Sequence, residues 1–398
     1  MSPLQQVETE NLFNTVYDIE GVRHPIENQQ ALDAAADYIH KKMHDSGMQV
    51  REQIFSVDGW DTPFRNIEGS IGPVDKRPAA VIVAHYDTVA ISPGANDNAA
   101  GVATMLEAGR ILAQLESPPP IYFVAVSLEE SSNPMMDGVE RESALKLGIK
   151  DKNNRFTSWE ITKSMKAIKN IVDTEYYGGK SQGDAYQIAL TKMRGDIPAT
   201  VKMHIEEIIP LYESTTIVSA IGTRSRIGSD RWVRDALKAN KSIAFSITLD
   251  EPGIFNNEPG TQGKLGGMGF ELFNHQYCMD AENQVGNFIA LITNKNSSHL
   301  GAVYHEYCQH KSIDLPCGWI DVDWSFDEVV KYGPIGLNSD HAPFWKAGIP
   351  ALLIFDTSDA RDPWVHTMAD SIDKIDFDRL GEVTQALIAT LMDKRSFG

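Results

Sequence analysis

Four short apolar runs restrict the fold of this chain more than any other feature. Each is nearly continuous in apolar residues and rich in Val, Ile and Phe, which is typical of strands that are buried on both faces of a sheet. Their length, about that of a single strand, separates them from membrane spans. The runs are AAVIVAHYD (79–87), PIYFVAVSLEE (120–130), IAFSITLD (243–250) and PALLIFDT (350–357).

Helical patterns alternate with these runs. Residues 30–48 carry apolar side chains at helical spacing, and the stretches 98–114 and 374–394 are also amphipathic. Two further strands are expected around 49–57 and 66–72. This alternation predicts an α/β fold, a three-layer sandwich with a mixed, mostly parallel central sheet.

The segment 131–226 differs from the rest of the chain. It is polar, contains many Lys, Glu and Ser residues, and shows helical patches around 158–170 and 182–194. We interpret it as a helical insertion that serves as a lid or as an assembly surface, and the second role would make the protein a homo-oligomer. The ranges 1–130 and 227–398 would then form one main domain.

Composition and charge exclude several classes of protein. The net charge of −19 argues against nucleic acid or an anionic membrane surface as the main partner. Three cysteines give neither a disulfide framework nor a four-cysteine zinc site. The N-terminal sequence lacks the basic start and apolar core of a signal peptide. A cytoplasmic location is therefore expected.

Histidine and acidic residues stand at the ends of the predicted strands. The first run ends in His85-Tyr86-Asp87, the second in Glu129-Glu130 and the third in Asp250. The fourth run leads into a loop that contains His366. Ligands of open α/β sheets bind outside the carboxyl ends of the strands, so we expect these side chains to share one site.

Imidazole and carboxylate ligands without thiolates suit zinc, manganese or cobalt in an open catalytic site. Two ions about 3.5–4 Å apart need a carboxylate between them. Asp97 is the natural bridge, because it lies in the loop SPGANDNAAG just before the helix expected at about 98. Taken singly, each of these residues has a plainer explanation as a helix cap, a turn residue, a solvated acid or a buried histidine. Their joint placement favours the metal site.

The sequence resembles metallopeptidase family 28, the co-catalytic zinc aminopeptidases and their relatives. The resemblance covers residues 30–130 and 227–394. The stretches that carry it are AHYDTVAISPGANDNAAGVATMLEAGRIL, FVAVSLEE, ITLDEPGIFNNEPGTQ, SDHAPFWKAGIPAL and WVHTMADSIDKID, in this order.

The resemblance implies a role for each residue. His85 and Asp250 would be the terminal ligands of one zinc ion, Glu130 and His366 those of a second, and Asp97 the bridge. Glu129 would be the general base, and Asp87 the carboxylate that orients His85. The cofactor implied is two zinc ions.

Two roles are considered for the motif Ser339-Asp340-His341. In the family it lies beside the substrate pocket, so Asp340 and His341 are predicted to contact the substrate. The alternative is that Ser339 or Asp340 caps a helix through Phe344-Trp345. We favour a combination, a cap that also places His341 near the bound substrate. Val365 stands where relatives often have tyrosine, which leaves the exopeptidase specificity open.

These features predict a zinc-dependent exopeptidase, most simply an aminopeptidase that acts on small peptides. A carboxypeptidase or a non-peptidase amidohydrolase would use the same metal residues. The glutaminyl cyclase group uses one zinc ion and lacks the full dinuclear set, which argues against it here. A receptor-like or assembly module that has lost catalysis would be expected to lack ligands, and all five are present.

Overall fold

The computed structural model describes residues 2–130, 133–265 and 267–397. Within them, nine strands form one mixed sheet in the order β1-β2-β4-β3-β5-β9-β7-β8-β6. The strands are β1 (Gln49–Phe55), β2 (Phe64–Ile71), β3 (Ala79–His85), β4 (Ile121–Val126), β5 (Ile243–Leu249), β6 (His275–Tyr277), β7 (Ile289–Thr293), β8 (Cys317–Asp321) and β9 (Ala351–Phe355).

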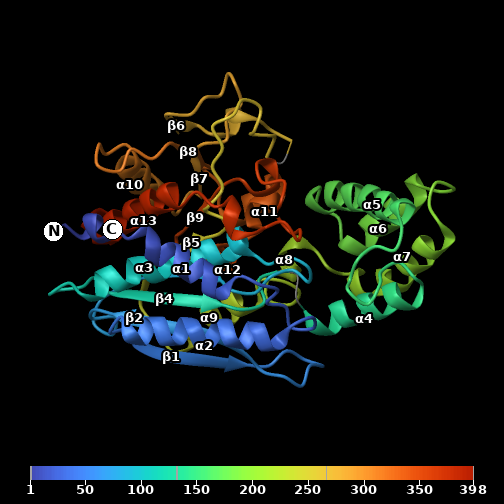
Figure 1. The fold of residues 1–398 in the computed structure, drawn as a ribbon, viewed down its shortest axis with the longest axis horizontal. Coiled ribbons are helices and arrows are strands. Elements are labelled where there is room, and N and C mark those ends of the chain that lie inside the picture. Colours follow the sequence, from blue (N-terminus) through green and yellow to red (C-terminus); the bar gives the residue numbers. More distant parts are fainter. Residues whose placement is uncertain (1, 131–132, 266, 398) are drawn as a thin grey trace.

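Helices cover both faces of this sheet (Figure 1). They are α1 (Thr9–Ile19), α2 (Gln29–Asp45), α3 (Gly101–Ala113), α4 (Pro134–Lys146), α5 (Trp159–Tyr177), α6 (Gln182–Lys192), α7 (Ala199–Tyr212), α8 (Ile217–Ala220), α9 (Ile227–Lys238), α10 (Ser298–Cys308), α11 (Phe326–Tyr332), α12 (Ala342–Lys346) and α13 (Phe377–Met392).

The four predicted apolar runs form the centre of the sheet. They are β4, β3, β5 and β9, which lie side by side and run parallel. Alternate residues of β3 enter two different cores, as expected for a strand that is buried on both faces. Ala80 and Ile82 pack in the core that contains α1, α2, α3, α10 and α13, whereas Val81 and Val83 pack with α9 and α12. The predicted three-layer sandwich is therefore confirmed.

Strands join the inner four antiparallel on both sides. β2 pairs antiparallel with β4, and β7 pairs antiparallel with β9, so the sheet is mixed. The strands β6, β7 and β8 were not predicted. Two of them have five residues and β6 has three, too few to show a period among the polar loops around them.

The helices α4 to α8 lie within the predicted insertion, 131–226. Four of them, α4 to α7, bury an apolar cluster of their own, which includes Ala144, Ile168, Ala185 and Ile205. Arg141 of α4 forms an ion pair with Glu27 of the main domain. In Figure 1 the arrow of β4 points toward these helices, so they lie beyond the carboxyl ends of the inner strands. The role of lid or assembly surface stays a prediction.

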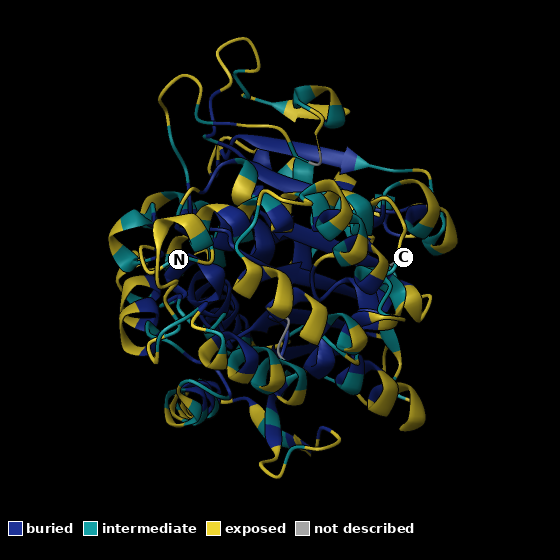
Figure 2. Ribbon diagram, turned by 90° about the vertical axis from the view of Figure 1, so that its right-hand side faces the viewer, coloured by how far each residue is buried: buried dark blue, intermediate teal, exposed yellow. Residues whose placement is uncertain are grey.

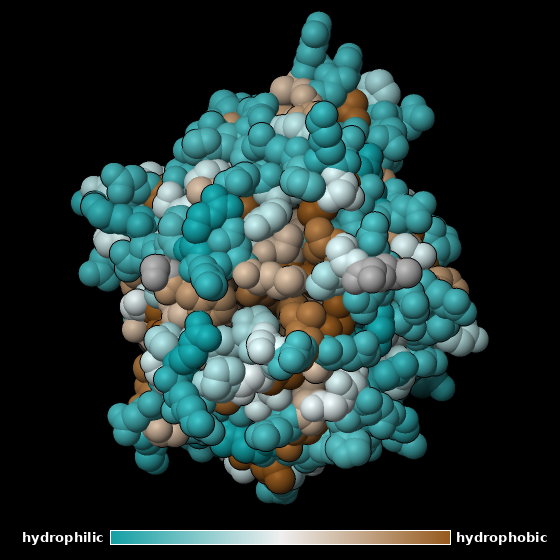
Figure 3. All heavy atoms as spheres, turned by 90° about the vertical axis from the view of Figure 1, so that its left-hand side faces the viewer, coloured by the Kyte–Doolittle hydropathy of each residue, from teal (hydrophilic) through white to brown (hydrophobic). Residues whose placement is uncertain are grey.

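The two ends of the molecule differ. Seen from the side of the insertion, exposed helices stand in front of the buried strands (Figure 2). Figure 3 shows the opposite end, near the chain termini, where hydrophilic side chains surround a central apolar area. None of the helices in the described part of the chain has the length and apolar character that a membrane crossing requires.

A buried histidine, His204, is expected to make the insertion sensitive to acid. Burial, with a further contribution from Lys150, lowers the pKa of His204 in α7 from 6.5 to about 4. Its Nδ1 lies 2.9 Å from the Ser143 hydroxyl, which donates to Glu207. Below pH 6.5 the unfolded chain binds a proton at this histidine, whereas the folded chain resists it down to about pH 4, so protonation favours unfolding across that window.

We expect His204→Gln to weaken the loss of stability between pH 7 and pH 5. Urea unfolding of the wild type and the variant at both pH values measures this difference. His44→Gln is the matched control, because the side chain of His44 is 74% exposed. An equal pH dependence for wild type and His204→Gln would contradict the assignment.

Candidate metal centre

Three adjacent parallel strands bring the predicted residues to one edge of the sheet. β3 ends at His85, and Asp250 follows β5 directly. β4 ends at Val126, earlier than predicted, and the chain turns through Leu128, whose φ is +60°, before it reaches Glu129 and Glu130. These two residues therefore lie on a loop rather than on the strand.

Asp97 stands between two histidines. Its Oδ1 lies 3.2 Å from Nε2 of His85, and its Oδ2 lies 3.1 Å from Nε2 of His366. The turn before it begins at Gly94, whose φ is +63°, and a Cβ there would lie 2.5 Å from the Asp97 carbonyl oxygen. Only glycine fits this turn without strain.

Each histidine has a second carboxylate of its own. Nε2 of His85 lies 3.2 Å from Oδ1 of Asp250, and Nε2 of His366 lies 3.1 Å from Oε1 of Glu130. Two groups of three residues, which share only Asp97, therefore surround the two histidines; a third group of possible metal ligands consists of His85, Glu129 and Glu130. In each group the ligand atoms lie within 4.8 Å of one another, close enough to hold a metal ion. The structure thus brings together all five predicted ligands, and their binding of metal stays a prediction.

The Asp87 carboxylate makes contacts beyond the predicted one to His85. Its two oxygens accept the backbone N–H groups of Glu129 and Glu130, each at 3.1 Å. It is the backbone carbonyl of Asp87 that lies 3.2 Å from Nδ1 of His85, whereas the carboxylate is 3.7 Å away. A carbonyl only accepts, so Nδ1 carries the proton and Nε2 is free to bind a metal. The Asp87 carboxylate therefore holds the backbone of both the predicted base, Glu129, and the predicted ligand Glu130.

Asp340 and His341 are fully buried. Asp340 accepts a hydrogen bond from the Ser229 hydroxyl, and Nε2 of His341 lies 2.7 Å from the Gly336 carbonyl oxygen. This burial fits a supporting role better than the predicted substrate contact, which stays untested.

The alternative of a helix cap is wrong, because α12 has His341 at its N-cap and no side-chain cap bond. Ser339 instead donates to Oδ2 of Asp250 at 2.6 Å, which orients this predicted ligand.

Two buried residues that the sequence did not point to hold the Asp97 loop. Asp370 accepts the backbone N–H groups of Asn96 and Asp97 at 2.8 and 3.2 Å. Arg23 donates to the carbonyl oxygens of Pro93 and Gly94, both at 2.9 Å. The position of Asp370, four residues after His366, is the one signal that could have marked it. Arg23, more than 60 residues from the loop, had no such signal.

Several carboxylates of this cluster are buried close to one another. Burial raises the pKa of Glu129 well above its usual range, and the charge of Glu130 adds to this effect. Burial likewise raises the pKa of Glu130 to about 8 and that of Asp340 to about 7. Divalent cations would offset this excess of negative charge. The imidazole and carboxylate donors, with no cysteine among them, therefore fit a catalytic metal centre.

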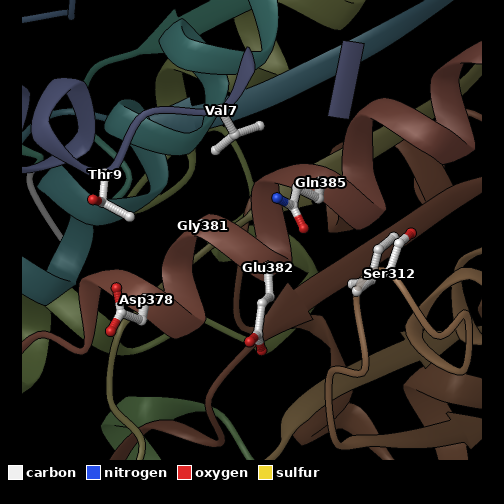
Figure 4. Close-up of a pocket in the computed structure, with 8 residues that line it drawn as sticks. Val7, Thr9, Ser312, Asp378, Gly381, Glu382 and Gln385 are labelled. Carbon is white, nitrogen blue, oxygen red and sulfur yellow. The ribbon is translucent and has the colours of Figure 1, made fainter. Parts of the chain in front are cut away.

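A hollow of about 320 Å³ lies elsewhere, beside α13. Figure 4 shows Asp378, Glu382 and Gln385 of this helix together with Val7 and Thr9 of the N-terminal segment above it. None of the predicted site residues lines it, so it is not part of the metal centre.

The sequence matches the profile of peptidase family M28 over residues 66–217 and 323–391, more than half of the chain. The chain belongs to peptidase family M28. It is thereby a peptidase-like hydrolase. The matched ranges include His85, Asp97, Glu129, Glu130 and His366, and they also run through most of the insertion, whereas Asp250 lies between them.

Curated relatives match only segments of the chain. The aminopeptidase YwaD of Bacillus subtilis is 47% identical over 68 residues, which are 17% of this chain and 15% of that protein. Another relative is 35% identical over 131 residues, 30% of this chain and 40% of its own length. The chain thus spans less than half the length of the curated relatives it matches.

Solved structures share the whole fold. The LapA aminopeptidase of Legionella pneumophila has a TM-score of 0.55 at 14% identity, over 98% of this chain and 73% of that one. The glutaminyl cyclase of Bacteroides thetaiotaomicron also has a TM-score of 0.55, at 17% identity, over 98% of this chain and 99% of that one. At identities this low, the structural matches show the fold alone and do not show which reaction this chain catalyses.

Proposed function

We propose that this protein is a dizinc exopeptidase, an aminopeptidase that acts on small peptides. The observation that carries the proposal is the position of Asp97, with one carboxylate oxygen toward each of two histidines. A single-metal site needs no such bridge. The named aminopeptidases among its relatives agree with this proposal.

His85, Asp97 and Asp250 would hold one zinc ion, and Asp97, Glu130 and His366 the other. Bound zinc lowers the pKa of a water molecule and polarises the carbonyl group of the substrate. Glu129 then has the role of general base. Its carboxylate takes a proton from the attacking water and passes it to the nitrogen of the leaving amine, which breaks the peptide bond.

Two backbone hydrogen bonds position Glu129 for this role. Its N–H is fixed by the Asp87 carboxylate, and its carbonyl oxygen accepts the backbone N–H of Arg226. Its neighbour Glu130, not Glu129, approaches His366. Glu129 also stands with His85 and Glu130 in a group that could hold a metal; we assign metal binding to Glu130, because it is the one that approaches His366, and proton transfer to Glu129.

The insertion is the reason for proposing small substrates. Its helices lie beyond the carboxyl ends of the inner strands, where substrate would have to enter (Figure 1). A lid in this position would restrict access by long or folded chains. Efficient cleavage of a folded protein would contradict this part of the proposal.

Digestion of a peptide panel by the zinc-loaded protein, with mass analysis of the products, tests the proposed activity. The panel contains free and N-acetylated dipeptides and tripeptides, a peptide of 20 residues, and a short peptide that begins with glutamine. We expect release of the N-terminal residue from the short free peptides, and little or no cleavage of the acetylated ones.

Each other outcome would contradict the aminopeptidase. Removal of C-terminal residues from acetylated peptides would indicate a carboxypeptidase. Loss of ammonia from the glutamine peptide without hydrolysis would indicate a cyclase, the reaction named for one of the structural neighbours. An absence of any turnover would favour a non-catalytic module.

A further inference from the structure

Arg226 stands directly beside the proposed base. It precedes α9 with a φ of +53°, and its backbone N–H donates to the carbonyl oxygen of Glu129 at 3.0 Å. The next two residues, Ile227 and Gly228, donate in the same way to Leu128 and Ser127. The backbone at Arg226 is therefore tied to the loop that carries Glu129 and Glu130.

The guanidinium of Arg226 is buried and poorly paired. The residue is only 4% exposed. Within the described part of the chain its side chain makes one hydrogen bond, from Nη1 to Oδ1 of Asn338 at 3.3 Å, and Nε is buried without a partner there. Among the described residues no carboxylate lies within 4 Å of it, although the chain as a whole has a net charge of −19. Burial of an unpaired cation is costly, which points to an anion that completes the site.

Contacts and charge effects connect Arg226 with both the metal centre and the insertion. Asn338 immediately precedes Ser339, which holds the proposed ligand Asp250. Tyr176 and Tyr177, at the end of α5, pack against the core that includes α12. The positive charge of Arg226 acts on both tyrosines, opposing the rise in pKa that burial causes.

We propose that Arg226 binds a carboxylate of the substrate, namely the C-terminal carboxylate of a short peptide. A guanidinium offers two parallel N–H donors that match a carboxylate, and burial strengthens this pairing. A peptide of two or three residues has its free carboxylate close to the scissile bond, which agrees with a substrate confined by the insertion. The inference rests on the proposed function and adds a substrate class to it.

The test compares three dipeptide substrates of the zinc-loaded wild type. They are a free dipeptide, its C-terminal amide, and a dipeptide amide whose second residue is glutamate. We expect kcat/KM for the free acid to exceed that for the amide about 10- to 100-fold, mainly through KM. Recovery of this advantage by the glutamate amide would show that a side-chain carboxylate also fits. Equal rates for acid and plain amide would overturn the proposal without any variant.

Arg226→Met and Arg226→Lys extend the test. The Met variant should bring the ratio of acid to amide close to one, and the Lys variant should restore part of it, because it keeps the charge and loses the paired donors. Arg194→Met, an exposed position of the insertion, removes the same charge and should keep the wild-type ratio. An equal fall for acid and amide in Arg226→Met would mean a purely structural role and would contradict the inference.

A direct binding measurement distinguishes a failure of this inference from a failure of the proposed function. Calorimetric titration of the zinc-loaded Glu129→Gln protein with the free dipeptide should give a Kd that the added Arg226→Met change weakens about 10- to 100-fold. If the wild type hydrolyses no peptide at all, the proposed function fails. If it hydrolyses acid and amide alike, or if Arg226→Met leaves the Kd unchanged, only the role of Arg226 fails.

Discussion

Glu129→Gln is expected to lower kcat by a factor of about 10²–10⁴ and to leave the zinc content of the protein unchanged. Glutamine keeps the shape of the side chain and cannot accept the proton of the attacking water. The backbone bonds that hold residue 129, from its N–H to Asp87 and from Arg226 N–H to its carbonyl oxygen, do not involve the side chain and should survive.

The neighbouring substitution Glu130→Gln is the matched control. It changes the same residue type one position along the same loop, but the Glu130 carboxylate lies 3.1 Å from Nε2 of His366. We therefore expect this variant to lose metal as well as activity. Steady-state kinetics and elemental analysis of both proteins distinguish the two roles. Full turnover by the Glu129→Gln protein would contradict the assignment of Glu129 as the general base.

Asp97→Ala is expected to abolish activity and to leave fewer than two zinc ions per chain. The single Asp97 carboxylate lies within 3.2 Å of both histidines, so its removal takes a ligand from both groups at once. Loss of any other proposed ligand leaves one group complete. Thermal unfolding should show that the variant is still folded.

Asp359→Ala serves as the control for Asp97→Ala, because Asp359 is exposed and lies outside the cluster. It should bind zinc and turn over substrate as the wild type does. An Asp97→Ala protein that keeps two tightly bound ions would contradict the bridging role. One that keeps wild-type activity would contradict the whole metal assignment.

The sequence predicted the part of the fold that depends on strand burial. The runs that became β3, β4, β5 and β9 were identifiable because strands buried on both faces must be apolar throughout. Their polar ends then indicated the site, because parallel strands deliver their carboxyl ends to one edge. The assignment of individual roles came instead from the resemblance to the family.

Other features depend on contacts between distant segments. The Asp87 carboxylate meets the backbone of Glu129 and Glu130 only because β3 and β4 are neighbours, and no local pattern records this. The burial of His341 and the position of Arg226 against Glu129 likewise arise from packing. Short strands such as β7 and β8 lack enough residues to reveal a period.

Zinc titration of the metal-free wild type, followed by recovery of peptidase activity, tests the dinuclear centre most directly. Two equivalents per chain are predicted, with full activity only after the second, because Asp97 links two groups of ligands. Saturation and full activity at one equivalent, or recovery of activity without any divalent metal, would contradict the account.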